Sequence, residues 1–262
     1  MGKHSRSPAT VVIPWLAPII TGELKAFAHT LAPADDLRPS IPAAAFLDPA
    51  TMDRLLDASA EYLGAGDRRA QTSLWCIEYV HALMPLPVVA SLRLGRALPL
   101  RLEDVSVILD EEHLPSTVRL RDDGGPCTDR DPFARFDGMI RGNLEPLIDA
   151  WAAYSGISPR VLWTNAANLY EAIMRYMEKQ PHAPREVIAE ADMLITRTQW
   201  PDGRRNPFAR PVLYRPEHPS NQRWRRVCCV RYLIPAHQYC SNCPHLLAGE
   251  EKTRRTKASP AA

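Results

Sequence analysis

Four of the six cysteines in this chain lie close together near its C-terminal end: Cys228, Cys229, Cys240 and Cys243. Thiolates are soft ligands, and four of them around one point can hold a zinc ion or an iron–sulfur cluster. A segment that binds such a group must fold so that all four side chains meet. This requirement constrains the C-terminal part of the chain more than any other feature of the sequence.

The spacing of the four cysteines helps to separate these two kinds of site. A zinc ribbon or knuckle offers two clips, each a pair of cysteines about two to four residues apart. Cys240 and Cys243 form such a clip, but the other two cysteines are adjacent. Neighbouring side chains diverge in regular backbone, so an adjacent pair reaches one small ion only where the backbone is distorted. A core with two irons accepts diverging thiolates more easily, so the spacing favours iron–sulfur chemistry and leaves a structural four-cysteine zinc site as an alternative.

The residues around the cysteines resemble those of a known family. The strings RRVCCVRY (225–232) and YCSNCP (239–244) resemble the C-terminal signature of FhuF-type ferric siderophore reductases. Upstream, LWTNAA (162–167) is similar to the family's Leu-Trp-x-Asn-x-Ala helix start. The resemblance is sharp over about residues 220–245 and looser over about 135–180.

The resemblance implies a cofactor, a fold and an activity. In that family the four cysteines hold a [2Fe–2S] cluster, and the fold is similar to that of siderophore synthetases. The implied activity is one-electron reduction of an Fe(III)–siderophore, with a hydroxamate as the expected chelator, to release Fe(II) for iron assimilation. The chain shows no flavin, haem or nicotinamide motif. We therefore expect an external electron donor, either a reductase or a ferredoxin-like protein.

Two other functional classes stay open. The chain could be an iron–sulfur electron carrier or sensor without a siderophore substrate, or a binding protein with a structural zinc site. A Rieske centre that uses His237 and His245 is disfavoured, because four cysteines already fill the ligand count. A disulfide framework is disfavoured by the length of the chain and the clustering of the cysteines.

The charge distribution points to the same region of the chain. The net charge of +2 predicts no nucleic-acid partner. From Arg197 to the end, however, thirteen Lys and Arg residues accompany only four Asp and Glu. Four of these cations flank the cysteines: Arg223, Arg225, Arg226 and Arg231. They are placed to tune the cluster or attract an anionic substrate or acidic partner. The alternative is that they are solvated or pair with the acidic body.

The sequence predicts a cytoplasmic protein. No apolar run approaches the roughly 20 residues of a membrane span, although peripheral membrane association stays open. The apolar run from Val11 to Ile20 imitates a signal peptide, but Pro14 and Pro18 interrupt it, so we expect no export. Thiols that act as metal ligands also favour a reducing compartment.

The predicted fold class is α+β: a mainly helical body, a small antiparallel sheet and an irregular C-terminal iron–sulfur segment. Hydrophobic periodicity predicts helices at 18–31, 49–63, 69–84, 132–154, 159–177 and 185–197, with Pro85 ending the third and Ser158 capping the fifth. Alternation of apolar residues predicts a β-hairpin within 98–121. Residues 121–131 and 200–226 are expected to be irregular.

We divide the chain into a body (1–199), a cluster-binding segment (200–248) and a disordered basic tail (249–262). Within the body, Cys76 is expected in the core and Cys127 in a loop. For Trp163 and Asn165, packing and local hydrogen bonding are favoured over contact with a substrate.

Overall fold

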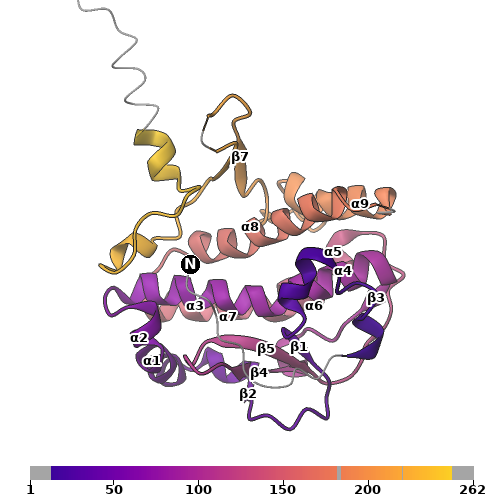
Figure 1. The fold of residues 1–262 in the computed structure, drawn as a ribbon, viewed down its shortest axis with the longest axis horizontal. Helices are drawn as coiled ribbons and strands as arrows, with labels where there is room; N and C mark the ends of the chain where they lie inside the picture. The colour runs from indigo at the N-terminus through magenta and orange to yellow at the C-terminus, as the bar shows by residue number, and fades with distance from the viewer. Residues whose placement is uncertain (1–12, 182–183, 220, 250–262) are drawn as a thin grey trace, which may run out of the picture.

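The computed structural model describes residues 13–181, 184–219 and 221–249. The body has three layers, which Figure 1 shows: a small sheet, a middle layer that contains α3 (Arg68–Leu83) and α7 (Glu145–Ser155), and an outer layer of α8 (Pro159–Glu178) and α9 (Arg185–Thr196). The predicted tail falls almost wholly outside the described residues. The domain division proposed from the sequence stays a prediction.

The main sheet has four strands in the order β1-β5-β4-β2. Its bounds are β1 Leu31–Ala32, β2 Ile41–Pro42, β4 Val105–Leu109 and β5 Pro115–Leu120. The predicted hairpin is confirmed as β4 and β5, in which Val107 lies opposite Val118. The sheet is mixed rather than wholly antiparallel, because β1 runs parallel to β5. Two further ladders pair β3 (Arg96–Ala97) with β6 (Gly125–Pro126), and β7 (Val212–Tyr214) with β8 (Arg223–Arg225).

Most of the predicted helices are confirmed. The predicted helix at 49–63 is α1 (Pro49–Ala58) followed by α2 (Ala60–Leu63), and α1 begins where Asp48 accepts a hydrogen bond from the N–H of Thr51. The predicted helix at 132–154 is α5 (Pro132–Arg135), α6 (Asp137–Met139), a π-helical turn (Ile140–Leu144) and α7.

Five predictions about helices and loops differ from the structure, and one of them is the predicted loop 121–131, which contains β6. Only a 3₁₀ helix, Gly22–Phe27, lies within the predicted helix 18–31. Pro85 does not end the helical run: it begins α4 (Pro85–Leu94), since proline is tolerated in the first turn of a helix. Ser158 precedes α8 but makes no capping hydrogen bond with its side chain. The segment 200–226 is not wholly irregular, because it contains the β7–β8 hairpin.

Helices α3 and α4 together form one helical run from Arg68 to Leu94. This run of 27 residues is long and apolar enough to cross a membrane, contrary to the prediction that no apolar run approaches the length of a span. However, 78% of its most apolar window is buried inside the protein, as expected for the central helix of a folded core.

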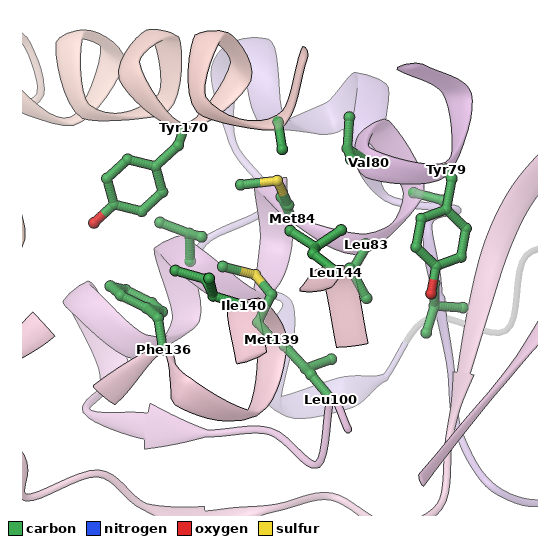
Figure 2. Close-up of a cluster of buried hydrophobic side chains, with 14 of the residues drawn as sticks. Tyr79, Val80, Leu83, Met84, Leu100, Phe136, Met139, Ile140, Leu144 and Tyr170 are labelled. Carbon is green, nitrogen blue, oxygen red and sulfur yellow. The ribbon is translucent and has the colours of Figure 1, made fainter. Parts of the chain in front are cut away.

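The core lies between the layers and is rich in aromatic side chains. Trp75 and Tyr79 from α3 meet Trp151 from α7 edge to face, with ring centroids 5.6 Å apart in both pairs. Phe136 packs in the same way against Tyr170 of α8, at 5.6 Å. Figure 2 shows this second contact beside the apolar side chains that fill the centre of the body. The core holds the first turns of α3 and α8 at one end of the body. The C-terminal segment packs against the body at this end (Figure 1).

Candidate metal centre and its surroundings

The four clustered cysteines come together, as the sequence predicts. The Sγ atoms of Cys228 and Cys243 are 3.7 Å apart. The thiol of Cys229 is hydrogen-bonded to those of Cys228 and Cys240. Cys229 and Cys243 are buried, with exposures of 2% and 0%, whereas the other two are partly exposed. The site therefore has a buried inner side and an outer side that solvent reaches.

A distorted backbone allows the adjacent cysteines to share one site. Val230, directly after them, has φ of 54°, in the left-handed region that branched residues rarely adopt. Such a conformation costs roughly 1–2 kcal/mol for a non-glycine residue. The turn directs the N–H of Val230 at Sγ of Cys228, 3.3 Å away, and the N–H of Arg231 at Cys229. The backbone thus supplies two donors to the sulfur atoms.

The second cysteine pair lies on a tight turn. The N–H of Cys243 donates to the carbonyl of Cys240 at 3.0 Å. The strand β8 is bonded to this turn, because the N–H of Arg225 donates to the carbonyl of Asn242 at 3.0 Å. This bond holds the two halves of the cysteine pattern together through backbone alone.

The charges around the thiols favour one thiolate in the absence of a metal. Hydrogen bonds from Cys228 and then Cys240 lower the pKa of Cys229, and the positive charge of Arg225 lowers it further. The pKa values of Cys228 and Cys240 are raised, first because each donates to Cys229 and then because of burial. Without a metal, the negative charge is therefore favoured on Cys229, while Cys228 and Cys240 stay protonated and donate to it.

Arg225 connects this centre to the body of the protein. Its side chain is 6% exposed and donates to the carbonyl of Val227 at 3.2 Å and to Oδ1 of Asn165. The Asn165 amide in turn donates to Oγ of Ser73 on α3 at 3.0 Å. Asn165 thus makes long-range hydrogen bonds, not the local ones predicted from the sequence. The chain Ser73–Asn165–Arg225 joins α3, α8 and β8 directly beneath the cysteines.

The other three predicted arginines have different surroundings. Arg223 pairs with the buried Glu171 of α8 at 2.7 Å, so it binds the acidic body as the alternative interpretation expected. Arg231 is hydrogen-bonded to Nδ1 of His237 at 3.0 Å. Arg226 is exposed, donates to the carbonyl of Val212 at 3.1 Å and lines a pocket. Influence of Arg223, Arg226 and Arg231 on a cluster stays a prediction.

The upstream cysteines lie where the sequence placed them. Cys76 is fully buried in α3, and burial raises the pKa of its thiol to about 12, so it stays protonated. Cys127 lies in the loop after β6, with Sγ 3.9 Å from Oγ of Ser91. Cys127 thus lies against α4, whereas Cys76 is hydrogen-bonded to Asn165, the residue that accepts the hydrogen bond of Arg225.

A pocket of about 610 Å³ adjoins the cysteine segment. Its walls come from α7, the first turns of α8 and residues 198–211, and it reaches Arg226 and Val227, directly before Cys228. Trp163 is in the core as predicted, but it also lines this pocket. The pocket was not predicted from the sequence, because the residues that line it are far apart in the chain.

The arrangement of the cysteines fits a [2Fe–2S] cluster. Four thiols are the ligand set of such a cluster, and two N–H donors to sulfur and one buried guanidinium suit its negative charge. Among the described residues, no group of three or more His, Cys, Asp or Glu side chains is placed as ligands of a single metal ion would be. The identity of all four cysteines as ligands stays a prediction.

Comparison with solved structures supports the fold. Aerobactin synthetase IucC from Klebsiella pneumoniae is similar with a TM-score of 0.55 at 14% identity, over 74% of this chain and 45% of that one. ATP-bound aerobactin synthetase IucA from the same organism gives 0.53 at 11% identity, over 65% and 37%. These similarities concern the fold alone, and they confirm the predicted likeness to siderophore synthetases.

Comparison with protein families and curated sequences supports the predicted family. The chain is 27% identical over 173 residues to the "Ferric siderophore reductase" of Escherichia coli (strain K12), a match that covers 65% of this chain and 64% of that protein. Residues 225–245 match the FhuF 2Fe-2S C-terminal domain, so the cofactor of this segment is a [2Fe–2S] cluster. Residues 73–218 match the model described as ferric iron reductase FhuF-like transporter. The chain is therefore a member of the FhuF family.

Proposed function

We propose that this chain is a ferric siderophore reductase. It takes one electron from an external donor, a reductase or ferredoxin-like protein, and passes it to an Fe(III)–siderophore of the hydroxamate class, which releases Fe(II) for iron assimilation. The observation that carries this proposal is the convergence of four cysteines within the segment that matches the FhuF 2Fe-2S C-terminal domain. The similar protein from Escherichia coli is named a ferric siderophore reductase, which supports the same activity here.

In this proposal Cys228, Cys229, Cys240 and Cys243 hold the cluster, which when bound supplies reversible one-electron chemistry. The residues around it offset negative charge. The N–H of Val230 donates to Sγ of Cys228 at 3.3 Å, and Arg225 brings a buried positive charge to Cys229 and Cys240. Both features favour the more negative, reduced state of the centre and so raise its reduction potential.

The chemistry of the substrate explains why one electron is sufficient. Hydroxamate oxygens are hard, anionic ligands that hold Fe(III) far better than Fe(II). The gain of one electron by the iron therefore weakens every iron–oxygen bond at once, and protonation of the freed hydroxamate prevents rebinding. No acid or base from the protein is required for this step. The protein contributes the electron path and a place for the chelate.

We place this reaction in the cytoplasm, because cysteine thiols that receive a cluster must be kept reduced. A membrane-bound electron donor would be compatible with this location, since the cysteine segment lies at one end of the molecule (Figure 1).

The proposal is tested by anaerobic purification followed by visible absorption and EPR spectroscopy of the reduced protein. We expect a red-brown protein with a rhombic signal that disappears when a ferric hydroxamate is added, with Fe(II) trapped by a ferrous chelator. The gallium(III) complex of the same hydroxamate, which accepts no electron, is the control and should leave the signal unchanged. A colourless protein with stoichiometric zinc would contradict the proposal. A reduced cluster that no ferric siderophore reoxidises would instead favour an electron carrier or sensor.

A further inference from the structure

The pocket beside the cysteine segment is placed to present a ligand to the cluster. Its volume of about 610 Å³ lies within the range of roughly 300–1,000 Å³ that small-molecule sites occupy. Arg226 and Val227 form part of its wall, and the next residue is Cys228. A molecule in this pocket would therefore lie beside the electron-transfer centre while remaining separate from the four thiols.

The pocket combines an aromatic base with a cationic rim. The rings of Trp163 and Trp200 line it and are 8% and 6% exposed, which gives a rigid apolar surface. Phe208 holds Trp163 in place through an edge-to-face contact at 5.7 Å, and Phe133 packs against Trp200 at 5.0 Å. Rings held in this way can contact a bulky chelate without loss of side-chain freedom.

Positive charge dominates the rim. Two carboxylates, Glu145 and Asp149, line the pocket. Five arginines line it as well: Arg160, Arg204, Arg205, Arg210 and Arg226. Arg204 is already paired, with Glu145 at 3.2 Å and Asp202 at 3.0 Å.

Three of these arginines are not neutralised within the described part of the protein. Arg160, Arg205 and Arg210 are exposed, and their guanidinium groups make no ion pair or hydrogen bond with any residue that the structure describes. A guanidinium offers a planar fork of donors that matches a carboxylate, and a cleft lined by one sign of charge concentrates ligands of the opposite sign.

We infer that this pocket is the binding site for the ferric chelate and that it selects chelates with net negative charge. The inference rests on the proposed function and narrows its substrate class, from ferric hydroxamates in general to hydroxamates that also carry carboxylate groups. A neutral tris-hydroxamate complex can contact the two tryptophans, but it offers no negative charge to Arg160, Arg205 and Arg210. The arginines of the rim should therefore bind the anionic chelate more tightly than the neutral one.

Binding can be measured apart from electron transfer by using gallium(III) complexes, which have the shape and charge of the ferric complexes but are not reduced. Two probes are titrated into the cluster-loaded full chain by calorimetry: an anionic gallium(III) complex of a citrate-derived dihydroxamate, and a neutral gallium(III) complex of a cyclic trihydroxamate. We expect tighter binding of the anionic probe, with an affinity that decreases as salt is added.

Substitutions of the unpaired arginines test the assignment of the pocket. The double variant Arg205→Gln/Arg210→Gln should bind the anionic probe about tenfold or more weakly, since hydrogen bonds from charged donors are lost. Its binding of the neutral probe should change little. Arg93→Gln, which removes an exposed arginine on α4 outside the pocket, is the matched control and should leave both affinities unchanged.

The result that would overturn the inference is equal binding of the anionic probe by the wild type and the double variant, or a stronger preference of the wild type for the neutral probe. This failure is distinct from failure of the proposed function. If only the pocket inference fails, the wild-type protein still reduces ferric hydroxamates. If the proposed function fails, the protein with a fully loaded cluster reduces none of them, whatever the pocket binds.

Discussion

Arg225, three residues before the first clustered cysteine, donates a side-chain hydrogen bond to Oδ1 of Asn165 on α8. These two residues lie in the two strings that resemble the family, RRVCCVRY and LWTNAA, which are far apart in the sequence. The contact brings both strings to one centre. Asn165 positions Arg225, and Arg225 brings its charge to Cys229 and Cys240.

Replacement of Arg225 should change the redox properties of the cluster. Arg225→Gln removes a buried positive charge next to an anionic centre, which disfavours the reduced state. We expect the reduction potential to fall by an amount on the order of tens of millivolts, because a stabilisation of about 1 kcal/mol corresponds to roughly 40 mV for one electron. An EPR-monitored redox titration measures this shift. Arg93→Gln should leave the potential unchanged, and an unchanged potential in Arg225→Gln would show that the arginine has only a structural role.

Replacement of Asn165 should destabilise the protein. Asn165→Leu has a similar volume but removes the acceptor for Arg225 and the donor to Ser73. A buried charged donor without a partner costs about 1–3 kcal/mol or more. We expect a loss of this size in the free energy of urea-induced unfolding. A variant as stable as the wild type would indicate that water replaces the lost contacts.

Individual cysteine substitutions should separate ligands from core residues. Cys229→Ser or Cys240→Ser removes one of four thiolates, so the visible spectrum and the iron and sulfide content of the native cluster should be lost. Cys76→Ser and Cys127→Ser are matched controls that leave the four-cysteine centre intact and should retain the native spectrum. A native spectrum in Cys229→Ser would contradict the ligand assignment.

Gly64 should be required for docking of the cysteine segment onto the body. It ends α2 with φ of 90°, and a Cβ atom there would lie 2.6 Å from Cγ2 of Ile234. Gly64→Ala should therefore displace the segment that follows Val230 and reduce the cluster content of the purified protein. Gly95→Ala is the control, because Gly95 also has positive φ (58°) but a Cβ atom would meet nothing within 4 Å. Equal cluster content in both variants would rule out the packing explanation.

The stability of the body should depend on the protonation of Asp36. A side-chain hydrogen bond from Arg38, opposed in part by burial, lowers the pKa of Asp36. Because the folded-state pKa is below the unfolded value of about 3.9, this stabilisation is complete above that value and is lost as the pH falls through the folded pKa. Urea unfolding between about pH 2 and 6 should show a weaker acid dependence for Asp36→Asn than for the wild type. The exposed neighbour Asp35 provides the control, Asp35→Asn, and an Asp36→Asn profile that is parallel to the wild type would refute the linkage.

Much of the local structure is predictable from the sequence because it depends on residues close together in the chain. The apolar period of 69–84 predicts α3, and the alternation around Val107 and Val118 predicts the β4–β5 hairpin. The predictions failed where proline was taken as a stop rather than a start, at Pro85, and where a short hairpin was hidden among prolines and arginines, at β7 and β8. Both misses reflect preferences that the local sequence leaves balanced and packing decides.

The sequence by itself determined the cofactor of the C-terminal segment, because the CC-x10-C-x2-C spacing and its flanking residues identify the [2Fe–2S] domain without any coordinates. Only the tertiary structure decided how that segment is used. Three features join residues that are distant in the chain. Asn165 contacts Arg225, Gly64 packs against Ile234, and arginines from three separate segments line one pocket. Such contacts arise from the packing of α3 and α8 around a shared core, and no local pattern of residues encodes them.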